Sequence, residues 1–347
     1  MNPDQLFDSP DLFLLSFEEK DAIFIDMDRA AYNRSVFLDG RISPRSQTLR
    51  RIPLAQLEEL SACYPLGEVG YIYHVAHCGS TLLARALDLP DSNLVLREPM
   101  ALRQLGVQGA ARFGADPGET WRRRARLAHQ MFARRYAKGA ATVVKANVPV
   151  NFIIPEFNDI AGAPPSIAIY FSLEDYLVAI LRSPNHRRWV ESVSAEVRPA
   201  ITELTGVAAA QSGAEAAALL WLAQMRVYHQ LMVRNDRAVS VNAEDLFNRP
   251  GDVIAAAFAH FGQPQSPALV ERITQSDLFA HYSKNPKVAF TNAARLERKR
   301  AMRAEIQPEL DQARALIERL PPAHTLPERL PRDLLGGEGA RLLEVNP

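Results

Sequence analysis

From Val69 onward, apolar residues gather in short runs that alternate with longer helical stretches. Strand-like runs are predicted at 69–76, 93–97, 142–146, 167–171 and 238–241. Helical stretches separate them, most clearly at 119–138 and 214–233. Short, wholly apolar strands that alternate with helices favour a parallel sheet covered on both faces. In such a sheet, ligands bind beyond the carboxyl ends of the strands.

The first 66 residues follow a different pattern and are interpreted as an N-terminal extension packed on the main domain. Short strands are predicted there at 21–27 and 35–38, and a helix at 52–60. The main α/β domain is expected to span 67–290. The remainder, 291–347, is expected to hold a charged helix at 295–320 and a proline-rich tail.

Composition narrows the classes of protein without choosing one. The chain has 347 residues, with 40 Lys and Arg balanced by 40 Asp and Glu, which disfavours a dedicated nucleic-acid binder. Its two cysteines, Cys63 and Cys78, do not suggest a disulfide framework. The N-terminus lacks the features of a signal peptide, and no apolar run approaches the length of a membrane span. We expect a cytoplasmic protein.

One segment predicts a binding site. The first strand of the α/β domain runs into His-Cys-Gly-Ser-Thr at 77–81, followed by a helical run. Gly79 permits a tight turn, Ser80 and Thr81 offer hydroxyl donors, and the helix start adds partial positive charge, so a phosphate or sulfate group is expected here. The alternative is an ordinary, well-capped helix start. A Walker A lysine is absent, because Ser80 directly follows Gly79.

Two charged residues follow other predicted strands at the same edge of the sheet. Glu98 comes after the second strand, where a carboxylate beside an anion site suits a general base. Alternatively, Glu98 caps the next helix or pairs with Arg97 or Arg103. Lys145 ends the third strand, and its ammonium group must enter a cleft or find a partner when buried. The alternative for Lys145 is an ion pair with a neighbouring carboxylate.

These residues carry a family resemblance. The segment 74–87 resembles the 5′-phosphosulfate loop of the P-loop sulfotransferases, in which a basic residue, a small residue and Gly-Ser/Thr-Thr precede Leu-Leu. Glu98 with Pro99 is similar to the Glu-Pro of bacterial members, and Lys145 matches the lysine after their third strand. The segment 242–262 looks like the family's late Glu-Asp-Leu, Asx-x-Pro and Phe-Leu-Gly region. The resemblance covers roughly 69–293.

The resemblance implies a P-loop-type three-layer α/β sandwich with a central parallel sheet. It also implies transfer of a sulfuryl group from 3′-phosphoadenosine 5′-phosphosulfate to a hydroxyl or amine of a small-molecule acceptor, with adenosine 3′,5′-bisphosphate as product. The donor's 5′ phosphate would be held by His77, Cys78, Gly79, Ser80, Thr81 and Leu82. Glu98 would be the general base, and Lys145 would stabilise developing charge.

His77 replaces the usual lysine or arginine of the loop and carries a full charge only when protonated, so mildly acidic conditions or a raised pKa are implied. No metal is expected, because the sequence has no recognisable metal motif. His74 is expected to be structural.

The resemblance breaks at the 3′-phosphate site. An arginine and a serine are expected there, but Phe171 and Ala179 occupy these positions. Arg182, with Lys284 or Lys287 from a late loop, is the predicted replacement. Two other functions stay open. One is a non-catalytic or altered-donor nucleotide-binding protein; the other is a P-loop kinase, which the missing loop lysine and strand-terminal aspartate disfavour. Neither the acceptor nor the oligomeric state is indicated.

Overall fold

The computed structural model describes residues 3–90, 92–283 and 285–343. Its centre is a five-stranded parallel sheet in the order β5-β6-β4-β7-β8. The strands are β4 (Gly70–His74), β5 (Asn93–Arg97), β6 (Ala141–Lys145), β7 (Ser166–Tyr170) and β8 (Ala238–Asn242). Nearly every strand residue is buried, as in a sheet covered on both faces. The predicted α/β sandwich is confirmed.

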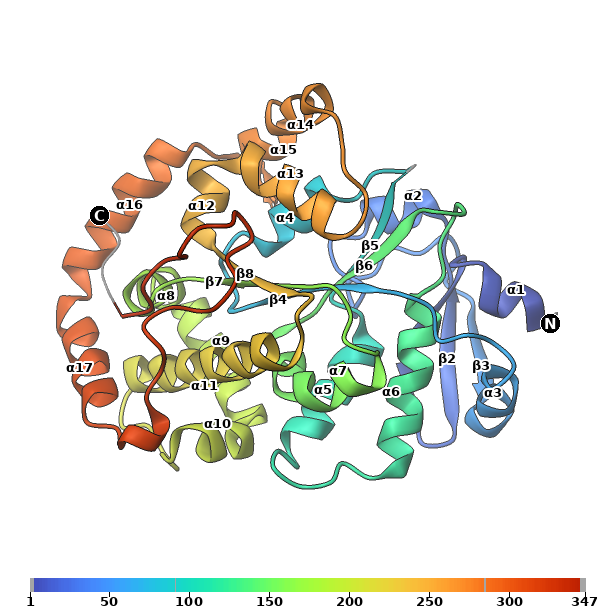
Figure 1. Cartoon of the computed structure of the whole chain (residues 1–347), viewed down its shortest axis with the longest axis horizontal. Helices are drawn as coiled ribbons and strands as arrows, with labels where there is room; N and C mark the ends of the chain where they lie inside the picture. Colours follow the sequence, from blue (N-terminus) through green and yellow to red (C-terminus); the bar gives the residue numbers. More distant parts are fainter. Residues whose placement is uncertain (1–2, 91, 284, 344–347) are drawn as a thin grey trace.

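Helices cover both faces of this sheet (Figure 1). One layer contains α4 (Ser80–Ala86), α12 (Ala243–Asn248) and α13 (Pro250–His260). The opposite layer contains α5 (Met100–Ala110), the 3₁₀ helix η1 (Val148–Ile153), α7 (Ile154–Ile160) and α11 (Gly213–Arg234). Packing is close: a β-carbon at Gly70 of β4 would collide with the ring of Phe261, just beyond α13. The sheet is therefore the middle of three layers.

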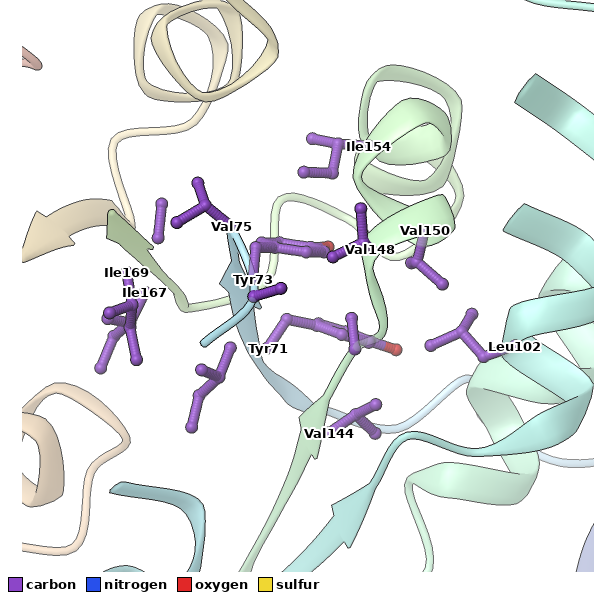
Figure 2. Close-up of a cluster of buried hydrophobic side chains, with 14 of the residues drawn as sticks. Tyr71, Tyr73, Val75, Leu102, Val144, Val148, Val150, Ile154, Ile167 and Ile169 are labelled. Carbon is purple, nitrogen blue, oxygen red and sulfur yellow. The ribbon is translucent and has the colours of Figure 1, made fainter. Parts of the chain in front are cut away.

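The central strand shows how the core is filled (Figure 2). Tyr71 and Tyr73 lie two positions apart in β4, so both rings project from the same face of the sheet. There they stack with ring centroids 5.9 Å apart. Val148 and Val150 of η1 meet them there. Because both faces of β4 are packed in this way, the residues just past its end are held against a rigid support.

The N-terminal extension forms its own antiparallel sheet in the order β1-β2-β3, on the side of the molecule nearest β5 (Figure 1). Its elements are α1 (Pro3–Asp8), β1 (Leu12–Phe17), β2 (Asp21–Asp26), α2 (Arg29–Arg34), β3 (Leu49–Pro53) and α3 (Leu54–Ser61). The backbone N–H of Phe17 at the end of β1 donates to the side-chain oxygen of Gln104 in α5 at 2.7 Å, which ties the N-terminal sheet to the helical layer of the main domain. The expected strand at 35–38 is wrong, because this stretch is a loop that bonds to the end of β5.

The C-terminal region contains two helices rather than the single one expected. They are α16 (Asn292–Glu305) and α17 (Gln307–Glu318), which run along the end of the molecule opposite the N-terminal sheet (Figure 1). Pro308 lies in the first turn of α17 and lacks the N–H that a continuous helix would need, so the helix breaks at Ile306. The remaining elements are α6 (Glu119–Phe132), α8 (Leu173–Ile180), α9 (Pro184–Glu196), α10 (Arg198–Thr205), α14 (Pro267–Thr274), α15 (Asp277–Ala280), β9 (His281–Tyr282), β10 (Asn285–Ala289) and η2 (Pro322–His324).

The topology points to the end of β4 as the place for a ligand. From β4 the chain goes first to β5 and β6 on one side, and then crosses to β7 and β8 on the other. The connections beside β4 therefore diverge and leave a crevice at its carboxyl end, where α/β sheets bind ligands. None of the helices in the described part of the chain is long and apolar enough to span a membrane.

Candidate anion and nucleotide site

The loop after β4 has an unusual backbone. Ala76 and His77 adopt positive φ angles of 71° and 51°, and Gly79 follows at 78°. Two successive non-glycine residues in the left-handed region cost on the order of 1–3 kcal/mol each, and such strain clusters at ligand sites. This loop is therefore a candidate binding element on its conformation alone.

Gly79 is required by packing. A β-carbon there would lie 2.9 Å from Phe247 and 3.0 Å from Leu246, both of α12, and the φ angle itself favours glycine. The nearest steric conflict of a side chain at this position is therefore with α12, inside the protein.

Thr81 supplies an unused donor. Its side chain is 2 % exposed, and Oγ1 has no hydrogen-bond partner in the described structure. Buried polar atoms are nearly always paired, so an orphaned hydroxyl calls for a ligand or a water. Ser80 is equally buried, and both residues line one cavity.

That cavity has a volume of about 650 Å³ and opens beside the loop. Its walls come from the loop, α8, α12, the β9–β10 hairpin and α16. An aromatic side is formed by Phe247, Phe290 and Tyr282, with centroids 5.9 Å apart for the first two and 5.3 Å for the last two. The volume lies within the range of small-molecule sites, and the rings offer an aromatic surface for a ligand.

Most of the cations that α16 brings to the cavity are already neutralised. Arg295 pairs with Glu244 at 2.6 Å, and Lys299 pairs with both Asp175 and Glu244, at 2.7 and 3.0 Å. Burial alone would raise the pKa of Glu244, but its hydrogen bonds and ion pairs with these cations outweigh burial and lower it. These groups hold α16 against α8 and α12.

Two arginines of the cavity lack an ion pair among the described residues. Arg182 donates to Nδ1 of His186 at 3.2 Å, and Arg298 donates to the hydroxyl of Tyr282. Much of each side chain is exposed, but packing around the Arg182 guanidinium lowers its pKa; Tyr282 opposes this shift, and the positive charge of Arg298 adds to it. Their mutual repulsion would be relieved by an anion.

The predicted 3′-phosphate residues can now be placed. Phe171, Ala179 and Arg182 line the same cavity. Lys287 is exposed and is not among the lining residues. Lys284 lies outside the described residues. Of the two predicted replacements that lie within the described residues, Arg182 is the one that the fold brings to the cavity, and Arg298 is a cation that sequence reasoning missed.

The other loop residues also have defined surroundings. His77 lines the cavity, and its ring centroid lies 3.9 Å from that of His186 and 5.9 Å from that of Trp189. Cys78 is fully buried, with Sγ 4.0 Å from the carbonyl oxygen of Ile169. Leu82 lines the cavity from the first turn of α4.

Glu98 and Lys145 meet at the ends of adjacent strands. Glu98 has a positive φ of 56°, and its N–H donates to the Lys145 carbonyl at 2.7 Å. Their side chains form an ion pair in which Lys145 is fully buried and the Glu98 side chain is 16 % exposed. The pairs considered for Glu98 are wrong, because Arg97 pairs with Asp88 and Arg103 with Glu196. The ion pair considered for Lys145 is present.

His74 joins this pair to the loop. Its Nδ1 accepts the N–H of Ala76 at 3.0 Å, so Nε2 carries the proton and donates to the Ala146 carbonyl at 2.8 Å. Nε2 also lies 3.1 Å from Nζ of Lys145 and 3.9 Å from a carboxylate oxygen of Glu98. The sequence signal that could have found this contact is a histidine at the last position of an otherwise apolar strand.

Comparisons with known proteins give distant likenesses. No family model matches the chain, and no curated protein matches it. Among solved structures, a sulfotransferase domain from the curacin biosynthetic pathway is 11% identical over 75% of this chain and 99% of its own, with a TM-score of 0.39. A sulfotransferase from Alicyclobacillus acidocaldarius is 14% identical over 72% of this chain and 95% of its own, with a TM-score of 0.36. Likenesses this distant do not assign a function.

Within the described residues, no three His, Cys, Asp or Glu side chains gather in a way that could hold a metal ion.

Proposed function

We propose that this protein transfers a sulfuryl group from 3′-phosphoadenosine 5′-phosphosulfate to a hydroxyl or amine of a small-molecule acceptor. The observation that carries the proposal is one cavity with two separate places for anions. The first is the strained loop with the unpartnered hydroxyl of Thr81, and the second is the arginine pair Arg182 and Arg298. A nucleotide with phosphates at its 5′ and 3′ positions needs both places, whereas one with a single phosphate chain needs only the first.

The cavity also suits the rest of such a nucleotide. Its volume of about 650 Å³ lies within the range of small-molecule sites. The faces of Phe247, Phe290 and Tyr282 offer surfaces on which a base can stack. These features favour a nucleotide over a simple inorganic anion.

The ion pair beside the loop supplies the proposed chemistry. As the acceptor atom bonds to sulfur, the bond from sulfur to the leaving phosphate oxygen breaks, and Glu98 takes the acceptor's proton. Its carboxylate is partly exposed, while Lys145 lies buried behind it and keeps it oriented. The hydroxyls of Ser80 and Thr81 and the loop backbone would stabilise the charge that develops on the leaving oxygen.

Calorimetric titration tests the donor. We expect adenosine 3′,5′-bisphosphate to bind at least about tenfold more tightly than adenosine 5′-monophosphate, because the arginine pair would hold the additional phosphate. Incubation with the sulfate donor and a panel of hydroxyl and amine acceptors should then release the bisphosphate. Failure to bind either nucleotide would contradict the proposal.

The second candidate is a protein with an altered donor. It is favoured by Phe171 and Ala179, which line the cavity and cannot bind a phosphate. Equal affinity for the two nucleotides would support this candidate. Magnesium-dependent transfer from a nucleoside triphosphate would instead indicate a kinase.

A further inference from the structure

The proposed reaction centre is closed on one side by the N-terminal extension. The closing segment is the loop 35–42 between α2 and β3. Leu38 clamps the turn that carries Glu98: its N–H donates to the Arg97 carbonyl at 2.7 Å, and its own carbonyl accepts the N–H of Met100 at 3.0 Å. The left-handed backbone of Glu98 is therefore held between two peptide groups fixed from a distant part of the chain.

Phe37 in this loop lies over Lys145. The ammonium nitrogen of Lys145 is 5.6 Å from the centre of the Phe37 ring, and the Arg41 guanidinium carbon is 4.0 Å from the same centre. Phe37 is 5 % exposed, and the Lys145 side chain is 0 % exposed. An aromatic face attracts a cation and, unlike water, offers it no hydrogen-bond acceptor.

The neighbours of Lys145 explain why this cover matters. Nε2 of His74 is near the ammonium group, but its proton is directed to the Ala146 carbonyl. The ammonium group of Lys145 therefore donates its hydrogen bond to the carboxylate of Glu98. If water reached Lys145, it would offer competing acceptors, and the carboxylate of Glu98 would lose its fixed orientation.

We propose that Phe37 is a positioning residue of the reaction centre, whose ring seals Lys145 from water and so holds the Lys145–Glu98 pair in one arrangement. The kinetic consequence rests on the proposed function, whereas the sealing is a property of the free protein. The N-terminal extension thereby completes the site rather than forming a separate module.

The sealing is tested by the rate at which an amine-reactive acetylating ester modifies Lys145 in the full-length protein, followed by peptide mass spectrometry. We expect Phe37→Leu to raise this rate at least about tenfold, and Phe37→Met, which fills similar volume without a ring, to raise it as well. Arg41→Ala removes the exposed stacking partner of Phe37 together with its ion pair to Asp39, but leaves the ring in place, and is expected to raise the rate less. Phe24→Leu, at a fully buried site of β2, is the matched control and should leave the rate unchanged.

Lys299 is an internal control, because its ion pairs with Asp175 and Glu244 lie far along the chain from the substitution. The proposal is overturned if Lys145 in Phe37→Leu reacts as slowly as in the wild type. It is equally overturned if Phe24→Leu accelerates Lys145 as much, or if Lys299 accelerates in parallel, since either result reports general loosening.

The kinetic arm uses the same variants. Phe37→Leu should lower kcat at least about tenfold with unchanged affinity for adenosine 3′,5′-bisphosphate, because the nucleotide cavity does not include Phe37. Faster labelling with an unchanged kcat would refute the positioning role. If the wild type transfers no sulfuryl group, the proposed function fails, and the labelling rates still decide whether Phe37 seals Lys145.

Discussion

The ammonium nitrogen of Lys145 lies 3.1 Å from Nε2 of His74, whose other ring nitrogen accepts the backbone N–H of Ala76 in the loop after β4. One buried imidazole thus connects the Lys145–Glu98 ion pair with the loop after β4. The geometry thereby fixes the position of Glu98 relative to the loop, although neither Glu98 nor Lys145 is among the residues that line the cavity.

Glu98→Gln preserves the shape of the side chain but removes its basicity. We expect turnover to fall about a hundredfold to ten-thousandfold, while the affinity for adenosine 3′,5′-bisphosphate is unchanged. Steady-state kinetics and calorimetry measure the two quantities. Glu68→Gln, at an exposed ion pair with Arg237, is the control and should alter neither. Near-normal turnover of Glu98→Gln would dismiss Glu98 as the base.

Thr81→Val removes a hydroxyl that has no partner within the protein. We expect thermal stability to stay the same or rise slightly, because no hydrogen bond within the protein is lost. The affinity for the bisphosphate should fall about tenfold, because the hydroxyl would bond to the bound phosphate. Thr205→Val is the matched control: its buried hydroxyl bonds to Ile201 at 2.8 Å, so stability should fall by about 1–2 kcal/mol with unchanged affinity. An unchanged affinity in Thr81→Val would remove Thr81 from the site.

Gly79→Ala and Gly139→Ala separate backbone strain from packing. Both glycines have positive φ, 78° and 87°, so each substitution costs about 1–2 kcal/mol through the backbone. At Gly139 a β-carbon meets nothing within 4 Å, whereas at Gly79 it meets α12. Urea unfolding should therefore show a larger loss for Gly79→Ala, accompanied by loss of nucleotide binding. If the two substitutions lower the free energy of unfolding equally, α12 moves aside for the new methyl group without a loss of stability.

Arg182→Ala and Arg298→Ala should each reduce the preference for adenosine 3′,5′-bisphosphate over the 5′-monophosphate about tenfold, because each arginine would contribute a charged hydrogen bond. The preference should also weaken at high salt, since both side chains are largely exposed. Arg188→Ala, outside the cavity, is the control. A preference that survives both cavity substitutions would place the 3′ phosphate elsewhere.

His129 makes stability depend on pH. Burial lowers its pKa from 6.5 to about 4, and its two ring nitrogens are occupied in the neutral form by Tyr71 and the Gly67 carbonyl. Between pH 6.5 and 4 the unfolded chain binds a proton that the folded protein does not, so stability falls as the pH falls, by roughly 3 kcal/mol in all. Urea unfolding between pH 6.5 and 4 should show a smaller fall in the free energy of unfolding for His129→Gln than for the wild type. If the free energy of unfolding depends on pH equally in the two proteins, His129 is not the cause of this dependence.

Local sequence determined much of the architecture. The five parallel strands and the glycine turn after β4 follow from short apolar runs and from one residue without a side chain, because such signals act over a few neighbouring residues. The positions of Glu98 and Lys145 at one edge follow equally, since parallel strands end on the same side. The break between α16 and α17 could also have been predicted from the sequence, because Pro308 interrupts the helix there. The charged pattern around Pro308 nevertheless suggests one continuous helix.

Only the tertiary structure decided which side chains contact one another at the carboxyl edge of the sheet. The ion pair of Lys145 with Glu98, rather than pairs of Glu98 with Arg97 or Arg103, depends on the pairing of β5 with β6, which brings together two residues 47 apart in sequence. The place of Phe37 over Lys145, and of Arg298 beside Arg182, depends on loops and helices docked from the two ends of the chain. The periodicity of apolar residues indicates which face of a helix or strand is buried. It does not indicate which other element covers that face, because this depends on the packing of the whole fold.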